Sequence, residues 1–153
     1  MSLQVYQLIE EHKAKIKQWI HEKKKSLNNS QLPIYSSFDL RDNGYKAAIV
    51  DSNLFPAGFN NLDINAQKRA VEAFSTYIPT VFSGKQILII PEMHTRNLYY
   101  LRNLKIIQSL LYRAGYKAII GSLRKDIIDD RIELKDSKGE NLILEKLFRN
   151  GKK

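Results

Sequence analysis

An alternation of short apolar runs with amphipathic helices is the feature that most constrains the fold of this chain. Apolar residues recur at three- and four-residue spacing from about Ile64 to Tyr77 and from about Asn97 to Ala114, which predicts two helices. Ile87–Ile90 is continuously apolar, as in a strand buried on both faces of a parallel sheet, and Lys117–Ile120 is predicted to be a further, mainly apolar strand. Ala47–Val50 supplies a strand before the first helix. The pattern predicts an α/β fold, a mainly parallel, Rossmann-like sheet with flanking helices.

Local signals predict where these helices begin and end. Asp63 can cap the first helix, Pro79 is expected to close it, and Gly115 is well placed to terminate the second. Before them, apolar residues at helical spacing predict one long amphipathic helix from about Leu3 to Leu27. We expect residues 1–153 to form a single domain.

Antiparallel hairpins are predicted at both ends of the sheet. Asn43-Gly44 can adopt the positive φ values of a tight turn, which would pair Ile34–Leu40 with Tyr45–Asp51. Residues 131–148 alternate as a second hairpin around Asp136–Gly139, either as an edge extension of the sheet or as the start of another element.

The loop after Asp51 combines breakers with apolar and amide side chains. Pro56 and Gly58 interrupt regular structure, while the neighbouring apolar residues, Phe59 among them, suggest a loop that folds back and packs. Such packing would gather a cation, carboxylates and amides suited to a small zwitterion: Asp39, Arg41, Asp51, Asn53, Asn60 and Asn61. The alternative is that turn chemistry alone accounts for the Asn and Asp residues.

A second polar group follows the apolar run at Ile87–Ile90. Glu92, His94 and Arg96 alternate along the chain, so an extended backbone would project them to one side, where they could bind an amino acid or assist proton transfer. One His and one carboxylate fall short of a metal ligand set, so no metal site is predicted. Both polar groups follow predicted strands, and we expect them to share one sheet edge if those strands run in the same direction.

Composition narrows the classes of partner. The chain has 153 residues, no cysteine and a formal charge of +9. Basic residues exceed acidic ones by three in residues 1–30, four in 31–120 and two in 121–153, so the charge is spread and a nucleic-acid partner is not favoured. No apolar run approaches the ~20 residues of a membrane span, and no secretory signal is recognisable. We therefore expect a cytoplasmic protein with no membrane partner.

Three strings carry a family resemblance. DLRDNGYK, VDSNLFPAGFNNL and IPEMHTRNLYYL resemble the N-terminal part of the proteobacterial-type glutamate-cysteine ligases, the first enzymes of glutathione synthesis. The resemblance implies an N-terminal α/β substrate domain of the pre-ATP-grasp type. It also implies substrate-binding roles for Asp39, Arg41, Asp51, Asn53, Asn60, Asn61, Glu92, His94, Arg96 and Asn97. Met93 stands where the family string suggests a polar residue. No catalytic residue can be assigned.

The same family implies chemistry that this sequence does not carry. ATP-dependent ligases form an acyl phosphate, which requires ATP and Mg²⁺, yet the seven glycines form neither a GxGxxG nor a Walker pattern. We expect the complete enzyme to use ATP and Mg²⁺ and this chain alone to bind neither. The resulting hypothesis is a substrate-binding N-terminal portion, truncated or split, inactive alone, with glutamate, cysteine and a C-terminal ATP-grasp part as partners. The alternatives are a non-enzymatic binding or regulatory module and, less favoured, a basic nucleic-acid-binding domain.

Overall fold

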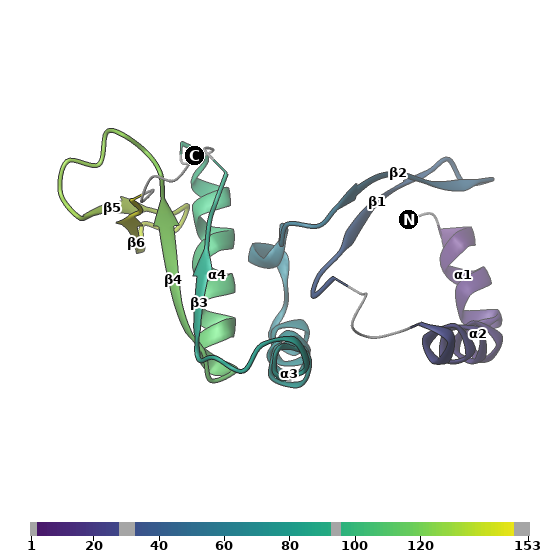
Figure 1. Cartoon of the computed structure of the whole chain (residues 1–153). Coiled ribbons are helices and arrows are strands. Elements are labelled where there is room, and N and C mark those ends of the chain that lie inside the picture. Colours follow the sequence, from purple (N-terminus) through teal and green to yellow (C-terminus); the bar gives the residue numbers. More distant parts are fainter. Residues whose placement is uncertain (1–2, 28–32, 93–95, 149–153) are drawn as a thin grey trace, which may run out of the picture. The chain divides into compact units, whose positions relative to one another are not determined.

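The structure is a computed structural model that describes residues 3–27, 33–92 and 96–148. Contacts within the chain separate it into two units, Met1–Pro56 and Ala57–Lys153, which are described one at a time. Figure 1 shows the order of their elements. The expectation of a single domain stays a prediction.

The first unit begins with two helices, α1 (Leu3–Glu11) and α2 (Lys13–Ser26), so the expected single helix is interrupted. The break falls at His12, whose backbone has φ −102° and ψ 10°. Both the His12 amide and its Nδ1 lie 3.1 Å from the Leu8 carbonyl oxygen. The backbone hydrogen bonds on both sides persist, from the His12 amide to Leu8 and from the Ile16 amide to His12 at 2.9 Å, so the interruption is a local distortion at one residue.

The predicted hairpin is present as β1 (Ser37–Asp42) and β2 (Ala47–Asn53), but its turn differs from the expected one. Among the described non-glycine residues none has a positive φ, so within this turn Gly44, at +87°, takes the left-handed conformation and Asn43 does not. The side-chain oxygen of Asn43 accepts hydrogen bonds from the amides of Tyr45 and Lys46, at 3.1 and 2.8 Å. The strands are therefore joined by a longer loop organised by Asn43 rather than by a two-residue turn.

The second unit contains the other two predicted helices, α3 (Ile64–Val81) and α4 (Leu98–Arg113). Asp63 caps α3 as expected, since its Oδ1 accepts from the Ala66 amide at 2.7 Å. Gly115, with φ +90°, follows the end of α4 as expected. The prediction that Pro79 closes α3 is wrong: it lies inside the last turn, and the Phe82 amide still reaches the Ile78 carbonyl at 2.8 Å. A proline this near the end removes one hydrogen bond without ending the helix.

A four-stranded sheet completes this unit, with the order β3 (Gln86–Ile89), β4 (Lys117–Ser122), β6 (Asn141–Lys146) and β5 (Arg131–Lys135). β3, β4 and β6 run parallel, and β5 is antiparallel to β6. The α/β class is confirmed, and the C-terminal hairpin is an edge extension of the sheet. β1 and β2, however, form a sheet of their own. We had expected Ala47–Val50 to belong to the parallel sheet as well. This expectation is wrong, because β2 pairs with β1 and not with a strand of that sheet.

The core of this unit lies between α4 and the sheet, which Figure 1 shows side by side. The buried apolar side chains include Leu101, Leu104, Ile107, Leu110, Leu111, Ile120, Leu142 and Leu144. Complete burial of a leucine or isoleucine side chain stabilises a fold by about 1.5–3 kcal/mol. The expectation that Ile87–Ile90 is buried on both faces is wrong, because β3 is an edge strand and Leu88 is 49% exposed.

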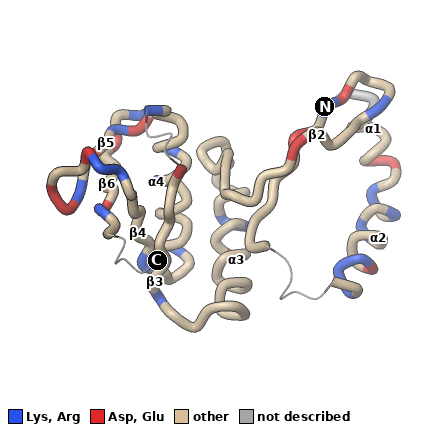
Figure 2. Tube along the Cα trace, turned by 45° about the horizontal axis from the view of Figure 1, so that its top comes forward, with Lys and Arg blue, Asp and Glu red and all other residues tan. Residues whose placement is uncertain are grey.

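Charged residues are distributed over most elements of the chain (Figure 2), as the sequence indicates. The described helices include none that is both long enough and apolar enough to cross a bilayer.

Candidate functional site

The hairpin of the first unit gathers four predicted site residues on one face. Asp39 lies opposite Asp51, Ser37 opposite Asn53, and Arg41 opposite Ala48. Cross-strand partners share a face and alternate residues along a strand do too, so Asp39, Arg41, Asp51 and Asn53 face the same way. Leu40 and Ile49, which are paired, lie on the other face. The hairpin thus gathers four of the six residues that were expected to lie together. Asn60 and Asn61 belong to the other unit, so their proximity to these four, like the substrate-binding role of all six, stays a prediction.

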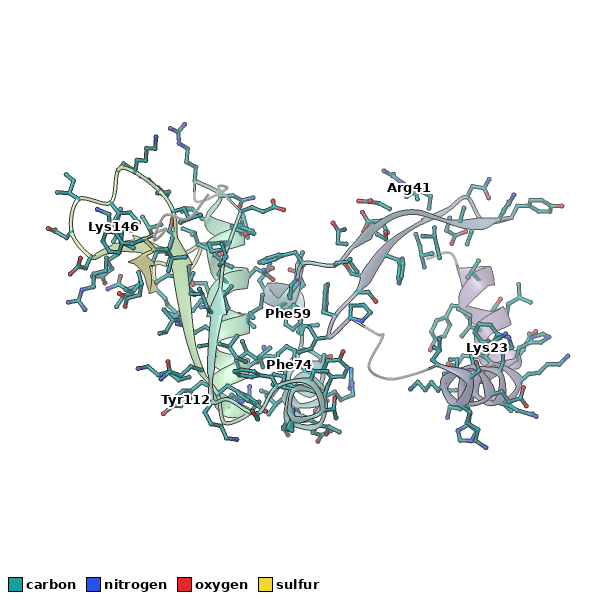
Figure 3. All side chains as sticks on the ribbon, in the orientation of Figure 1. Lys23, Arg41, Phe59, Phe74, Tyr112 and Lys146 are labelled. Carbon is teal, nitrogen blue, oxygen red and sulfur yellow. The ribbon has the colours of Figure 1, made fainter. Side chains whose placement is uncertain are left out.

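This polar face has both signs of charge. The opposed carboxylates of Asp39 and Asp51 repel each other unless a cation lies near them. Arg41 follows two positions along β1 and lines an open cleft of about 460 Å³ together with Lys46. Figure 3 shows the Arg41 side chain extending away from the ribbon. Asp42 lines the same cleft, so the guanidinium and the ammonium offer donors to a ligand carboxylate beside one fixed negative charge.

The amide-rich loop continues into the second unit, where it folds back as expected. Residues Phe59–Asn61 form a short 3₁₀ helix, η2, after Gly58, whose φ is +78°. Phe59 is 5% exposed and stacks on Phe74 of α3, with ring centroids 6.2 Å apart; Figure 3 shows the two rings together. The apolar anchor leaves Asn60 half-buried and Asn61 exposed, with the Nδ2 of Asn60 donating to the Oδ1 of Asn61 at 3.0 Å.

The second predicted group lies between β3 and α4. Glu92 is exposed, and its backbone amide donates to the phenolic oxygen of Tyr100 at 2.8 Å. Arg96 is exposed. Asn97 is the N-cap of α4, and its Oδ1 accepts from the amides of Tyr99 and Tyr100 at 3.0 and 3.2 Å. The Oδ1 atom of Asn97 therefore caps the N-terminus of α4. His94 lies outside the described residues.

Two residues that the sequence did not single out hold these segments in place. The Oδ1 of Asn103 accepts from the Phe59 amide at 2.8 Å, and Asn103 is 2% exposed. A buried Asn among the leucines of an inner helix face needs a hydrogen-bond partner, and this pattern could have identified Asn103 from the sequence.

No comparable sequence pattern identifies Tyr100. Burial raises the pKa of its phenol, with the Glu92 charge as a further cause, so the group is neutral at neutral pH.

The expected meeting of the two polar groups at one sheet edge is wrong. β2, which precedes the amide-rich loop, belongs to the two-stranded sheet, whereas β3, which precedes Glu92, belongs to the four-stranded one. Within the second unit, α4 instead contacts both η2, through Asn103, and the segment after β3, through Tyr100.

An ion-pair network holds the β5–β6 turn against the first turns of α4. Asp136, 2% exposed, accepts from Arg102 Nη1 at 3.0 Å, and Glu140 pairs with both Arg102 and Lys105 at 2.8 Å. The Ser137 amide also donates to the Leu98 carbonyl at 3.1 Å. Burial alone would raise the pKa of Asp136, but the guanidinium and two turn amides outweigh it and lower this pKa.

The described side chains do not form a recognisable metal site. Within residues 3–27, 33–92 and 96–148 no three His, Cys, Asp or Glu side chains cluster closely enough to hold a metal ion.

Comparison with known proteins identifies the family. The glutamate-cysteine ligase family matches residues 6–153. The chain belongs to this family. A crystal structure of a candidate gamma-glutamylcysteine synthetase from Methylobacillus flagellatus KT is similar, with 33% sequence identity and a TM-score of 0.78. The similarity covers 93% of this chain and 33% of that one, so the chain spans about a third of the length of the relative. No curated protein matches.

Proposed function

We propose that this chain supplies the amino-acid-binding part of an ATP-dependent glutamate-cysteine ligase. The observation that carries the proposal is the family match over residues 6–153. The complete reaction would join the γ-carboxyl group of glutamate to the amine of cysteine through an acyl phosphate. The α/β unit would be the pre-ATP-grasp type of substrate domain.

The chemistry of the polar groups supports a substrate role. Arginines occur in both, at Arg41 and Arg96, and a guanidinium can bind a substrate carboxylate through two parallel hydrogen bonds. Asn60, Asn61 and Glu92 add amide and carboxylate groups that can bind the other polar atoms of an amino acid. Asp39, Asp51, Asn53, His94 and Asn97 complete the proposed substrate-side set.

In this proposal, ATP and Mg²⁺ would be bound by a part of the enzyme outside these 153 residues. The relative that this chain matches is about three times as long, which leaves room for an ATP-grasp region there. In this arrangement the chain binds glutamate and cysteine in the cytoplasm but does not activate the carboxylate alone.

Isothermal titration calorimetry tests the proposal. We expect L-glutamate or L-cysteine to bind this chain, and ATP-dependent product formation only when an ATP-grasp part, such as the remaining two thirds of the Methylobacillus protein, is added. Absence of binding by either amino acid would favour a non-enzymatic module. ATP hydrolysis by this chain alone would contradict the proposal that a separate part of the enzyme binds ATP.

A further inference from the structure

Two side chains on successive turns of α4 hold the polar segments of the second unit. Asn103 accepts from the Phe59 amide and Tyr100 accepts from the Glu92 amide, each at 2.8 Å. Residues three apart on a helix are surface neighbours, with Cβ atoms about 5–6 Å apart. The segment with Asn60 and the segment with Glu92 are thus attached to residues three positions apart on one helix.

Tyr100 also makes hydrogen bonds to both Glu92 and Asn97. Its phenolic oxygen accepts from the Glu92 amide, and its own amide donates to the Asn97 side chain at 3.2 Å. The half-buried ring limits the movement of the phenol. Asn103 is more deeply placed, and the bond it makes to the Phe59 amide is buried. Each anchor therefore fixes a backbone whose neighbouring polar side chains reach solvent.

We propose that Tyr100 and Asn103 are positioning residues that assemble one amino-acid-binding site on α4. The groups that contact the ligand come from the two anchored segments: Asn60, Asn61, Glu92 and Arg96. The Arg96 guanidinium is complementary to a carboxylate, the Glu92 carboxylate to an ammonium, and the asparagine amides to the remaining donors and acceptors. This inference rests on the proposed function and deepens it, because it says which four of the ten candidate residues share one ligand.

The alternative is that both anchors serve only folding, and Tyr100→Phe separates the two roles. The substitution removes one oxygen, and the Glu92 amide lies at an exposed position where water can replace it. We expect the melting temperature to stay near that of the wild type while the affinity for L-glutamate or L-cysteine falls about 5- to 10-fold. Tyr99→Phe is the matched control, since this ring is 70% exposed on the same helical turn; it should bind like the wild type. Equal affinity of Tyr100→Phe and Tyr99→Phe would overturn the positioning role.

Amide-resolved NMR titration of the wild type provides an independent measurement. L-Glutamate and L-cysteine are added in turn, and the Asn60–Asn61 side-chain amides are followed together with the amides of Glu92 and Arg96. One shared site predicts that both segments respond to the same ligand with the same Kd. A response confined to one segment would refute the shared site and leave the proposed function standing. No response to either amino acid would refute both.

Asn103→Ala extends the test to the second anchor. We expect it to enlarge the spread of Asn60 and Asn61 conformations, so that their ligand-induced shifts shrink while those of Glu92 persist. Circular dichroism establishes that the variant is folded. Unchanged shifts at Asn60 and Asn61 in a folded variant would remove Asn103 from the positioning role.

Discussion

Replacing Asp136 by Asn should destabilise the second unit in a pH-dependent way. The carboxylate accepts three hydrogen bonds, from Arg102 at 3.0 Å and from the amides of Lys138 and Glu140 at 2.8 and 3.0 Å. An Asn side chain can still accept from the two amides, but the charge-assisted bond to Arg102 is lost and an NH₂ group faces the guanidinium.

The magnitude follows from what remains around Arg102. Breaking a buried ion pair costs about 3–5 kcal/mol when a charge is left buried and unpaired. Arg102 is 15% exposed in its side chain and keeps Glu140 at 2.8 Å, so its charge stays compensated. The loss is then closer to that of one charge-assisted hydrogen bond, about 2 kcal/mol at pH 7.

The sign of the pH dependence follows from the pKa of Asp136, which is lowered in the folded protein. The stabilisation is fully present above the unfolded pKa of about 3.9 and is lost as pH falls through the lower folded pKa. The difference in the free energy of unfolding between the wild type and Asp136→Asn should therefore become smaller below about pH 4.

Urea unfolding followed by circular dichroism at pH 7 and in steps below pH 4 measures this deficit. Trp19 lies in the other unit, so its fluorescence is not the appropriate signal. Asp129→Asn is the matched control, because Asp129 is exposed, and its effect should stay within about 0.5 kcal/mol. A deficit of Asp136→Asn that does not change with pH, or that equals the control, would refute the assigned role of the ion pair.

Three further substitutions test single groups. Arg96→Lys should weaken glutamate binding by about 1–3 kcal/mol in calorimetry, because a point charge replaces a two-pronged donor; a lower melting temperature with unaltered affinity would instead assign Arg96 to folding. Asn97→Ala removes the cap of α4 and should lower the free energy of urea unfolding by about 1 kcal/mol, whereas Asn97→Asp, which keeps an acceptor, should stay near the wild type. Gly115→Ala places a side chain at φ +90° and should cost about 1–2 kcal/mol in the same assay; no loss would contradict the assigned strain.

Local chemistry made the helices and most of their ends predictable. Asp63 and Gly115 act through hydrogen bonds or backbone angles within a few residues, so the sequence contains both partners of the interaction. Pro79 was misjudged for a related reason: its effect depends on where the last turn lies. The interruption at His12 is a departure of one residue from helical backbone angles, which helical spacing alone does not reveal.

Sheet membership was less predictable because strand pairing is non-local. The apolar run at Ala47–Val50 fits a parallel strand and a hairpin strand equally well, and the Asn43 loop decides in favour of the hairpin. The polar residues proposed for the site come from the sequence and their role stays a prediction, whereas the residues that anchor their segments could not be named from it. Asn103 meets Phe59 across 44 positions of the chain, a separation over which no local pattern carries information.

The error about the sheet edge and the importance of α4 have one physical origin. A sheet edge can gather loops only from strands that belong to that sheet, and the strand before the amide-rich loop does not. A helix packed on the sheet can bind segments beside it through hydrogen bonds, provided that some positions next to its apolar face carry polar side chains. Tyr100 and Asn103 do so one turn apart, and the caps and ion pairs at Asn97 and Arg102 hold the same end of the helix. The start of α4 thus combines residues that stabilise the fold, Asn97 and Arg102, with the two residues that we propose arrange the candidate site, Tyr100 and Asn103.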